Sequence, residues 1–242
     1  MSQFPQKALV AGATGGTGVR TLARLRQMGV GVRVFTRDRN RASRFQDTEV
    51  VEGNALVKSD CSRAIEGCDA VVCSIGERWT PKGRPIVDGD GIINLADAAA
   101  AAGARRFVLV SSLGVGETWA WLPFFVKWIF QLLGVVPILK EKERSETHLK
   151  SLQLDWTILR PAMLTNLQMG AEPFVVKDGR AGGTTTRHAV ADVAVRCLGS
   201  PNSIGTVLTV VDRCMRFTLS GPGSFQLDMA WERWLEQDGA SS

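Results

Sequence analysis

Three glycines near the amino end constrain the fold of this chain more than any other feature. Gly12, Gly15 and Gly18 give the spacing G-x-x-G-x-x-G, directly after the apolar run 7–11 and directly before a segment, 15–28, with apolar residues at helical spacing. Glycines allow the sharp exit from a strand and a close approach of backbone to ligand. The helix start then offers free N–H groups and a positive dipole end. The sequence therefore predicts a strand, a turn that binds phosphate, and a helix.

Strand-like and helix-like segments alternate through the first half of the chain. Such alternation demands crossover connections and predicts an α/β fold with a doubly wound, mostly parallel sheet, the Rossmann arrangement. Strands are expected at 7–11, 31–36, 50–51, 70–75, 107–111, 156–159, 174–177 and 206–211, and helices at 15–28, 91–102, 140–151 and 188–198. The length of 242 residues suits a single domain, 1–242. Within it we expect a C-terminal substrate-pocket region, an apolar aromatic insertion at 113–139 and a helical tail at 221–242.

Several function classes are excluded or disfavoured by what the chain lacks. It contains no tyrosine, so no mechanism can use a phenolic acid or base. The five cysteines form no C-x-x-C pair and there are only two histidines, so we expect reduced thiols and no metal site. The glycine turn lacks the G-K-[ST] of nucleoside triphosphatases. The arginines concentrate at 20–44 and do not form a diffuse basic face, so no nucleic-acid partner is expected.

The arginine-rich segment predicts which dinucleotide the chain prefers. Eight arginines lie between residues 20 and 44, against the single acid Asp38. An NAD site would place a carboxylate at the end of the second strand, but this strand ends in Thr36-Arg37, and Arg41 follows one turn later. A guanidinium there suits the additional 2′-phosphate of NADP(H). Asp38 is expected to cap a helix or to pair with an arginine.

The motifs G-A-T-G-G-T-G and V-F-T-R resemble the atypical short-chain dehydrogenases, in particular the NmrA-like, NAD(P)H-binding branch with the flavin and biliverdin-IXβ reductases. Further similar motifs are W-T-I-L-R-P at 156–161 and D-V-A at 192–194, so the resemblance spans about residues 7 to 211. It implies NADP(H) as cofactor. The implied cofactor-binding residues are Gly12, Thr14, Gly15, Gly16, Thr17, Gly18, Arg37, Arg41, Asn54, Ala55, Ser74, Ile75, Gly76, Ser111, Pro161 and Met163.

The resemblance also implies two catalytic residues, and the chain departs from the family at two positions. One is Met163, which stands where the flavin and biliverdin reductases have a histidine. Ser112 matches the serine that the flavin and biliverdin reductases present beside the nicotinamide; a simple strand-end cap is the alternative. Most of the superfamily uses Y-x-x-x-K, and the matching segment 138–142 has isoleucine in the tyrosine position. Lys142 would hold a ribose hydroxyl, with Lys140 as a rival on spacing alone. The implied function is hydride transfer from NADPH to a planar conjugated acceptor: a flavin, a biliverdin-like tetrapyrrole or a quinone. The alternative is a catalytically silent NADP(H)-binding regulator or assembly factor.

The aromatic insertion leaves three interpretations open. Its rings could stack on a planar aromatic substrate, attach the chain peripherally to a membrane through 119–139, or form an ordinary buried helix or dimer contact. The expected substrate-pocket residues are Arg78, Trp79, Trp119, Trp121 and Phe125. We expect a monomer or homodimer. The first seven residues have no apolar signal core, so the expected location is cytoplasmic or another reducing compartment, with peripheral membrane contact as an option.

Overall fold

The computed structural model describes residues 4–45, 47–77, 85–166, 173–177, 181–212 and 216–218. Its centre is an eight-stranded sheet with the order β3-β2-β1-β4-β5-β6-β10-β8. All neighbours in this sheet are parallel except β8, which runs antiparallel to β10. The strands are β1 Lys7–Ala11, β2 Gly31–Thr36, β3 Glu49–Glu52, β4 Ala70–Cys73, β5 Arg106–Val110, β6 Asp155–Pro161, β8 Pro173–Val176 and β10 Thr206–Asp212. The predicted doubly wound α/β sheet is confirmed.

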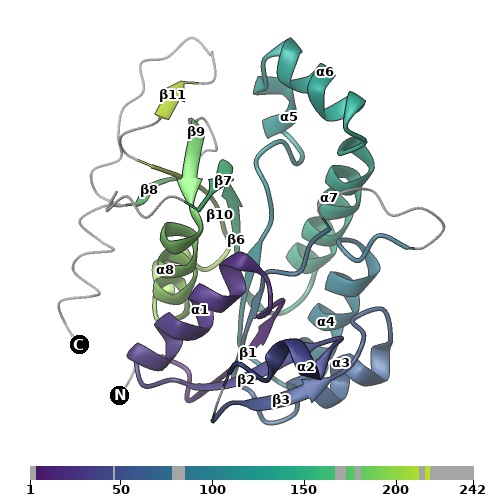
Figure 1. The fold of residues 1–242 in the computed structure, drawn as a ribbon, viewed down its shortest axis with the longest axis vertical. Helices are drawn as coiled ribbons and strands as arrows, with labels where there is room; N and C mark the ends of the chain where they lie inside the picture. The colour runs from purple at the N-terminus through teal and green to yellow at the C-terminus, as the bar shows by residue number, and fades with distance from the viewer. Residues whose placement is uncertain are drawn as a thin grey trace.

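Helices cover both faces of this sheet (Figure 1). One face carries α1 and α8, and the other carries α3, α4 and α7. The helices are α1 Gly16–Gln27, α2 Arg39–Ala42, α3 Lys58–Ile65, α4 Asp90–Ala101, α5 Thr118–Trp121, α6 Phe124–Leu132, α7 Val136–Ser151, α8 Arg187–Leu198 and a single 3-10 turn, η1 Pro201–Ser203. Strand β1 shows how the sequence divides the core, because Ala8 and Val10 pack under α1 and α8 while Leu9 and Ala11 face the opposite layer.

A second, smaller sheet stands beyond the carboxyl ends of the main strands, opposite α5 and α6 (Figure 1). It consists of β7 Met163–Thr165, β9 Ala181–Thr186 and β11 Arg216–Thr218, in the order β11-β9-β7. Strand β6 continues through Arg160 to Pro161, two residues beyond its expected end at 159. The predicted helical tail, 221–242, lies outside the described residues.

Buried cysteines fill the sheet interior as small apolar side chains. Cys61, Cys68, Cys73 and Cys197 are buried and free of disulfides. Burial raises the pKa of Cys61 to about 12 and that of Cys73 to about 11. These thiols therefore stay protonated and take no part in nucleophilic or redox chemistry. The fifth cysteine, Cys214, lies outside the described residues.

Candidate functional site

The glycine turn joins β1 to α1 and is shaped by contacts that exclude side chains. Gly12 has a φ of +85°, and a Cβ at this position would lie 2.7 Å from the carbonyl carbon and oxygen of Ser74 at the end of β4. A Cβ on Gly18 would lie 2.2 Å from the Gly12 carbonyl oxygen. Both distances are too short for any real contact, so only glycine lets the turn, β4 and α1 come this close. Gly18 thus packs the helix against the turn and is itself covered.

The amino end of α1 is available for an anion. Gly15 is the N-cap residue, no side chain caps the helix, and its first turn contains no acid. The backbone N–H groups of this first turn have no partner inside the helix, and the helix dipole adds positive potential there. Two arginines brace the turn from outside: Arg20 donates to the Gly16 carbonyl at 2.7 Å and Arg44 to the Thr14 carbonyl at 3.0 Å. This cradle fits a diphosphate.

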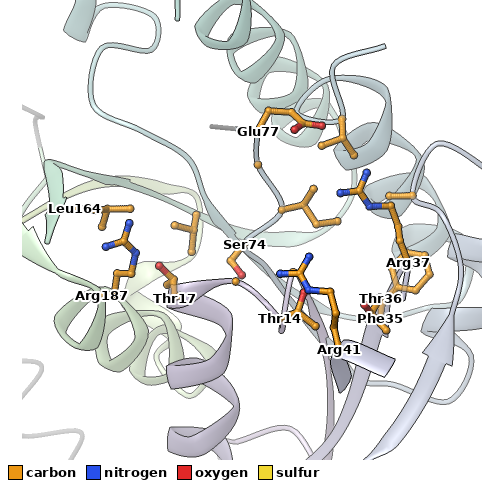
Figure 2. Close-up of a pocket in the computed structure, with 18 of the residues that line it drawn as sticks. Thr14, Thr17, Phe35, Thr36, Arg37, Arg41, Ser74, Glu77, Leu164 and Arg187 are labelled. Atoms are coloured by element: carbon orange, nitrogen blue, oxygen red, sulfur yellow. The ribbon is translucent and has the colours of Figure 1, made fainter. Parts of the chain in front are cut away.

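A cavity of about 1030 Å³ opens directly over this turn, along the carboxyl ends of the parallel strands. Ligands of doubly wound sheets bind at this edge, where the strand order reverses on either side of β1. Figure 2 shows Thr14, Thr17 and Ser74 in the middle of the pocket, with Arg37 and Arg41 on one side and Arg187 and Leu164 on the other. The predicted site residues that line it are Gly12, Thr14, Gly15, Gly16, Thr17, Arg37, Arg41, Ala55, Ser74, Ile75, Gly76, Ser111, Ser112 and Lys142.

Arg37 and Arg41 bring two guanidinium groups to one end of the cavity. Asp38, between them, is confirmed as the N-cap of α2, because its carboxylate accepts from the Asn40 and Arg41 N–H groups. Within the described part of the chain, neither guanidinium has an ion pair with a carboxylate. Asp38 also lines the cavity, but its carboxylate caps α2 and is outnumbered by the two guanidinium groups, so this end fits a phosphate.

Except for the exposed Arg39, the other arginines of the segment have partners within the protein. Arg33 is buried and pairs with Glu49, while Arg24 pairs with Asp192 on α8. The N–H groups of Arg33 also reach the carbonyls of Ala64 and Glu66. The segment is therefore not one anion site as a whole: Arg37 and Arg41 face the cavity, and their neighbours fasten helices and the glycine turn.

Lys142 stands at the other end of the cavity, on the inner face of α7. Its side chain is buried, and its ammonium nitrogen lies 2.7 Å from Asp88 Oδ1. Asp88 is fully buried and accepts from the Glu77 N–H at 2.8 Å through its other oxygen. Lys140 is exposed to solvent and lines no part of the cavity. Of the two rival lysines, Lys142 is the one placed to meet a ligand.

A buried ionic network backs the cavity wall behind Ser111. The Ser111 hydroxyl donates to Glu146 Oε1, one helical turn beyond Lys142. Both oxygens of Glu146 accept from Arg160, and Arg160 also donates to Glu117 at 2.6 Å. Burial by itself would lower the pKa of Arg160, but the hydrogen bonds that it donates to Glu146 and Glu117, with the negative charge of these carboxylates, outweigh burial and raise the pKa overall. The network holds the Ser111 hydroxyl in place at the cavity wall.

Some predicted site residues lie elsewhere. Asn54 uses its side-chain oxygen to accept from the Leu56 N–H, and the side chain of Met163 is 70% exposed. Trp119 packs against Phe130 with ring centroids 6.4 Å apart. None of Gly18, Asn54, Pro161, Met163, Trp119, Trp121 and Phe125 belongs to the described cavity lining. Arg78 and Trp79 lie outside the described residues.

The structure adds residues to the site that sequence reasoning missed. Arg187, the first residue of α8, donates to Asn166 at 2.9 Å, and both line the cavity. A Cβ on Gly16 would lie 2.6 Å from Arg187 Cδ, so this arginine covers the glycine turn from the far end of the chain. Its local sequence, T-T-T-R-H, gave no signal for a ligand. Only the tertiary packing of α8 on α1 brings it there.

The two histidines lie outside this cavity. His148 is 2.6 Å from Asp97, and His188 accepts from Arg20 at 3.1 Å. Among the residues that the structure describes, no three histidine, cysteine or acidic side chains gather as metal ligands. No helix in the same part of the chain has the length and hydropathy to cross a bilayer.

Comparison with known proteins gives the family and the fold. A family model described as NAD(P)H-binding matches residues 12–201. An uncharacterized chloroplastic protein of Arabidopsis thaliana is 32% identical over 221 residues, covering 86% of this chain and 77% of that protein. Protein TIC 62, chloroplastic, of rice is 28% identical over 79% of this chain. This chain spans only 42% of the rice protein. Because both relatives are chloroplastic proteins, the cytoplasmic location stays an expectation.

Solved structures have the same architecture. ChuY, an anaerobilin reductase from Escherichia coli O157:H7, is 25% identical with a TM-score of 0.74, covering 86% of this chain and 97% of its own. A short-chain dehydrogenase/reductase from Veillonella parvula in complex with NADP has a TM-score of 0.73 at 19% identity, covering 91% of this chain and 100% of its own. The second likeness shows a shared fold.

Proposed function

Because this chain belongs to the NAD(P)H-binding family, within the atypical short-chain dehydrogenases that its motifs resemble, we propose that it is an NADPH-dependent reductase of a planar conjugated acceptor. The observation that carries the proposal is one cavity that has Arg37 and Arg41 at one end and Ser111, Ser112 and Lys142 at the other. The glycine turn lies between these ends. This order suits a dinucleotide laid along the strand ends, with its adenosine half toward Arg37.

The residues present fit this cofactor. The uncapped amino end of α1 would hold the diphosphate, with Arg187 close by. Arg37 and Arg41 would hold the 2′-phosphate through charge-assisted hydrogen bonds. Lys142 would hold a ribose hydroxyl, since it is the buried ammonium group at that end and Asp88 fixes its position. When bound, the reduced nicotinamide supplies the hydride.

The chain has no tyrosine, and no histidine belongs to the described cavity lining, which supports an acceptor that stabilises negative charge by itself. Ile138, in the position of the family's tyrosine, is buried and outside the described cavity lining. The Ser111 hydroxyl donates to Glu146, and the Ser112 hydroxyl donates to the Leu113 carbonyl at 3.0 Å. Each hydroxyl proton is therefore already used within the protein, so both serine oxygens can only accept hydrogen bonds from a ligand. A conjugated ring system delocalises the added charge and takes its proton from water, so the protein supplies orientation and electrostatics.

This function predicts a clear acceptor preference. We expect the purified protein to oxidise NADPH in the presence of free flavins, biliverdin or quinones, and to leave simple ketones and aldehydes unreduced. The reason is that carbonyl reduction needs a proton donor in place of the missing phenol. The measurement is the loss of NADPH absorbance with each acceptor in turn. Equal reduction of simple ketones would contradict the proposal. Tight NADPH binding with no oxidation by any acceptor would favour a silent NADP(H)-binding regulator.

Arg37→Ala tests the cofactor preference. We expect it to weaken NADPH binding about ten- to a hundredfold, since a charge-assisted hydrogen bond contributes about 1.5–3 kcal/mol. NADH, which lacks the 2′-phosphate, should bind within about twofold of the wild type. Arg39→Ala is the matched control, because Arg39 is an exposed arginine two residues further along the chain and lines no part of the cavity. Calorimetric titration of the wild type and both variants with NADPH and with NADH measures all six affinities. Equal losses for NADPH and NADH would show that Arg37 does not contact the 2′-phosphate.

A further inference from the structure

Helix α6 carries its apolar residues on the side that faces solvent. None of its residues is buried, and its sequence, FFVKWIFQL, contains only two polar residues. The exposed fractions of Phe124, Trp128 and Leu132 are 85%, 66% and 70%. With exposed Phe125, Ile129 and Leu133 these side chains form one continuous apolar stripe, the α6 stripe. A surface helix in water normally has the reverse arrangement, so this stripe indicates a partner.

The inner face of α6 is fixed to the protein. Phe130 packs against Trp119 of α5, and a Cβ on Gly114 would contact the Phe130 ring at 3.6 Å. Lys127 donates to the Ala120 carbonyl at 3.2 Å, with its ammonium group 5.9 Å from the centre of the Trp119 ring. These contacts hold the helix in place and leave the α6 stripe pointing outward. No α6 residue lines the described cavity, so the stripe is not part of the cofactor site.

We propose that the α6 stripe is a docking surface for an anionic lipid membrane, lying in the headgroup region without crossing the bilayer. Trp and Phe side chains suit this interface, because they combine a large apolar body with tolerance of a wet boundary. The nearby charges also fit. Residues 118–140 contain no acid, and of their two lysines Lys127 is held against α5 while Lys140 is exposed. The acids on either side, Glu117 and Glu141, are paired with Arg160 and Arg144. Net charge on the whole chain is +5. Lysines beside an apolar stripe are attracted to anionic headgroups.

The same charges disfavour a second copy of the chain as the partner. A two-fold interface brings the same surface of both subunits together, so the positive charge of this segment would face itself. The acids on either side of the segment, Glu117 and Glu141, are already paired with Arg160 and Arg144. In Figure 1, α6 stands beyond the carboxyl ends of the sheet strands, the edge along which the cavity opens. Docking through α6 would turn the carboxyl ends of the sheet strands toward the lipid. The docking proposal does not depend on the proposed reaction.

The test is co-sedimentation of the full chain with phosphatidylcholine vesicles, with and without phosphatidylglycerol. We expect the wild type to sediment with the anionic vesicles and to be released by salt. The triple variant Phe124→Ser/Trp128→Ser/Leu132→Ser should bind them at least about tenfold more weakly, because it loses most of the inserted apolar area. Val57→Ser/Ile204→Ser is the matched control, since both residues are exposed and apolar but lie on other elements, and it should bind like the wild type.

Two further measurements make each result decisive. NADPH affinity, measured for every variant, should be unchanged and reports an intact fold. Lys140→Glu should weaken binding to the anionic vesicles and leave binding to the phosphatidylcholine vesicles unchanged. This variant tests the electrostatic attraction to the headgroups even if the triple variant does not fold. The proposal is overturned if the wild type ignores anionic vesicles, or if the triple variant or the Lys140 variant binds them as well as the wild type. A wild-type dimer that the triple variant separates into monomers would identify a second copy as the partner and also overturn it.

Discussion

Glu146→Ala is expected to lower the free energy of unfolding by about 3–5 kcal/mol, because it breaks a buried ion pair and leaves one partner behind. Arg160 is 1% exposed, and Glu146 accepts from it through both carboxylate oxygens. Removing that carboxylate leaves a buried cation with only Glu117, whose side chain is more than half exposed. The Ser111 hydroxyl loses its acceptor as well. Urea unfolding of the wild type and the variant measures the difference.

Two controls separate burial from charge. Glu141→Ala removes the carboxylate of an exposed pair with Arg144 on the same helix, and should cost less than about 1 kcal/mol. Glu146→Gln keeps the side-chain volume and one acceptor oxygen for Ser111, so its loss should fall between the two alanine variants. If Glu146→Ala and Glu141→Ala destabilised the protein equally, the network behind Ser111 would not be the buried ionic unit described above.

Gly12→Ala is expected to abolish measurable NADPH binding, a loss of at least about a hundredfold. The new Cβ would collide with backbone atoms of Ser74 at 2.7 Å, and backbone cannot move aside as a flexible side chain can. The positive φ adds strain of about 1–2 kcal/mol. Relief of the clash must displace the turn from the end of β4, which moves the N–H groups of α1 away from the diphosphate.

Gly29→Ala is the matched control for this variant. Gly29 also has a positive φ, +72°, but a Cβ there would meet nothing within 4 Å. It should therefore show the strain alone: a loss of about 1–2 kcal/mol in the free energy of unfolding, with NADPH affinity within about twofold of the wild type. Calorimetric titration and urea unfolding of both variants test this. Retained NADPH binding in Gly12→Ala would mean that the turn does not need the close approach.

The central sheet and the glycine turn could be predicted from sequence because their signals are local. Short apolar runs such as 70–75, which contains β4, favour strands buried on both faces, and a glycine spacing between a strand and a helix has one common structural use. That Arg37 and Arg41 line the cavity could also be predicted, because they come directly after the second strand. Lys142 could be separated from Lys140 only in the structure, since both lysines fit the spacing and burial decides between them.

Other parts of the fold and of the site depend on tertiary contacts. Strand β9, Ala181–Thr186, is buried throughout although its sequence, AGGTTT, has no apolar pattern. Helix α3, Lys58–Ile65, was not anticipated because it is short and buries mainly small side chains. Arg187 and Asn166 reach the cavity through the packing of α8 and the strand β7 region, far along the chain from the glycine turn. The orientation of the aromatic residues in α6 was also undetermined, because their spacing does not say which face is covered.

A structure determined with NADPH bound tests the central claim most directly. The account predicts the diphosphate on the N–H groups at the start of α1, the 2′-phosphate on Arg37 or Arg41, and the nicotinamide at the end of the cavity formed by Ser111 and Lys142. A dinucleotide bound at any other place, or laid in the reverse direction with its nicotinamide against Arg37, would contradict it.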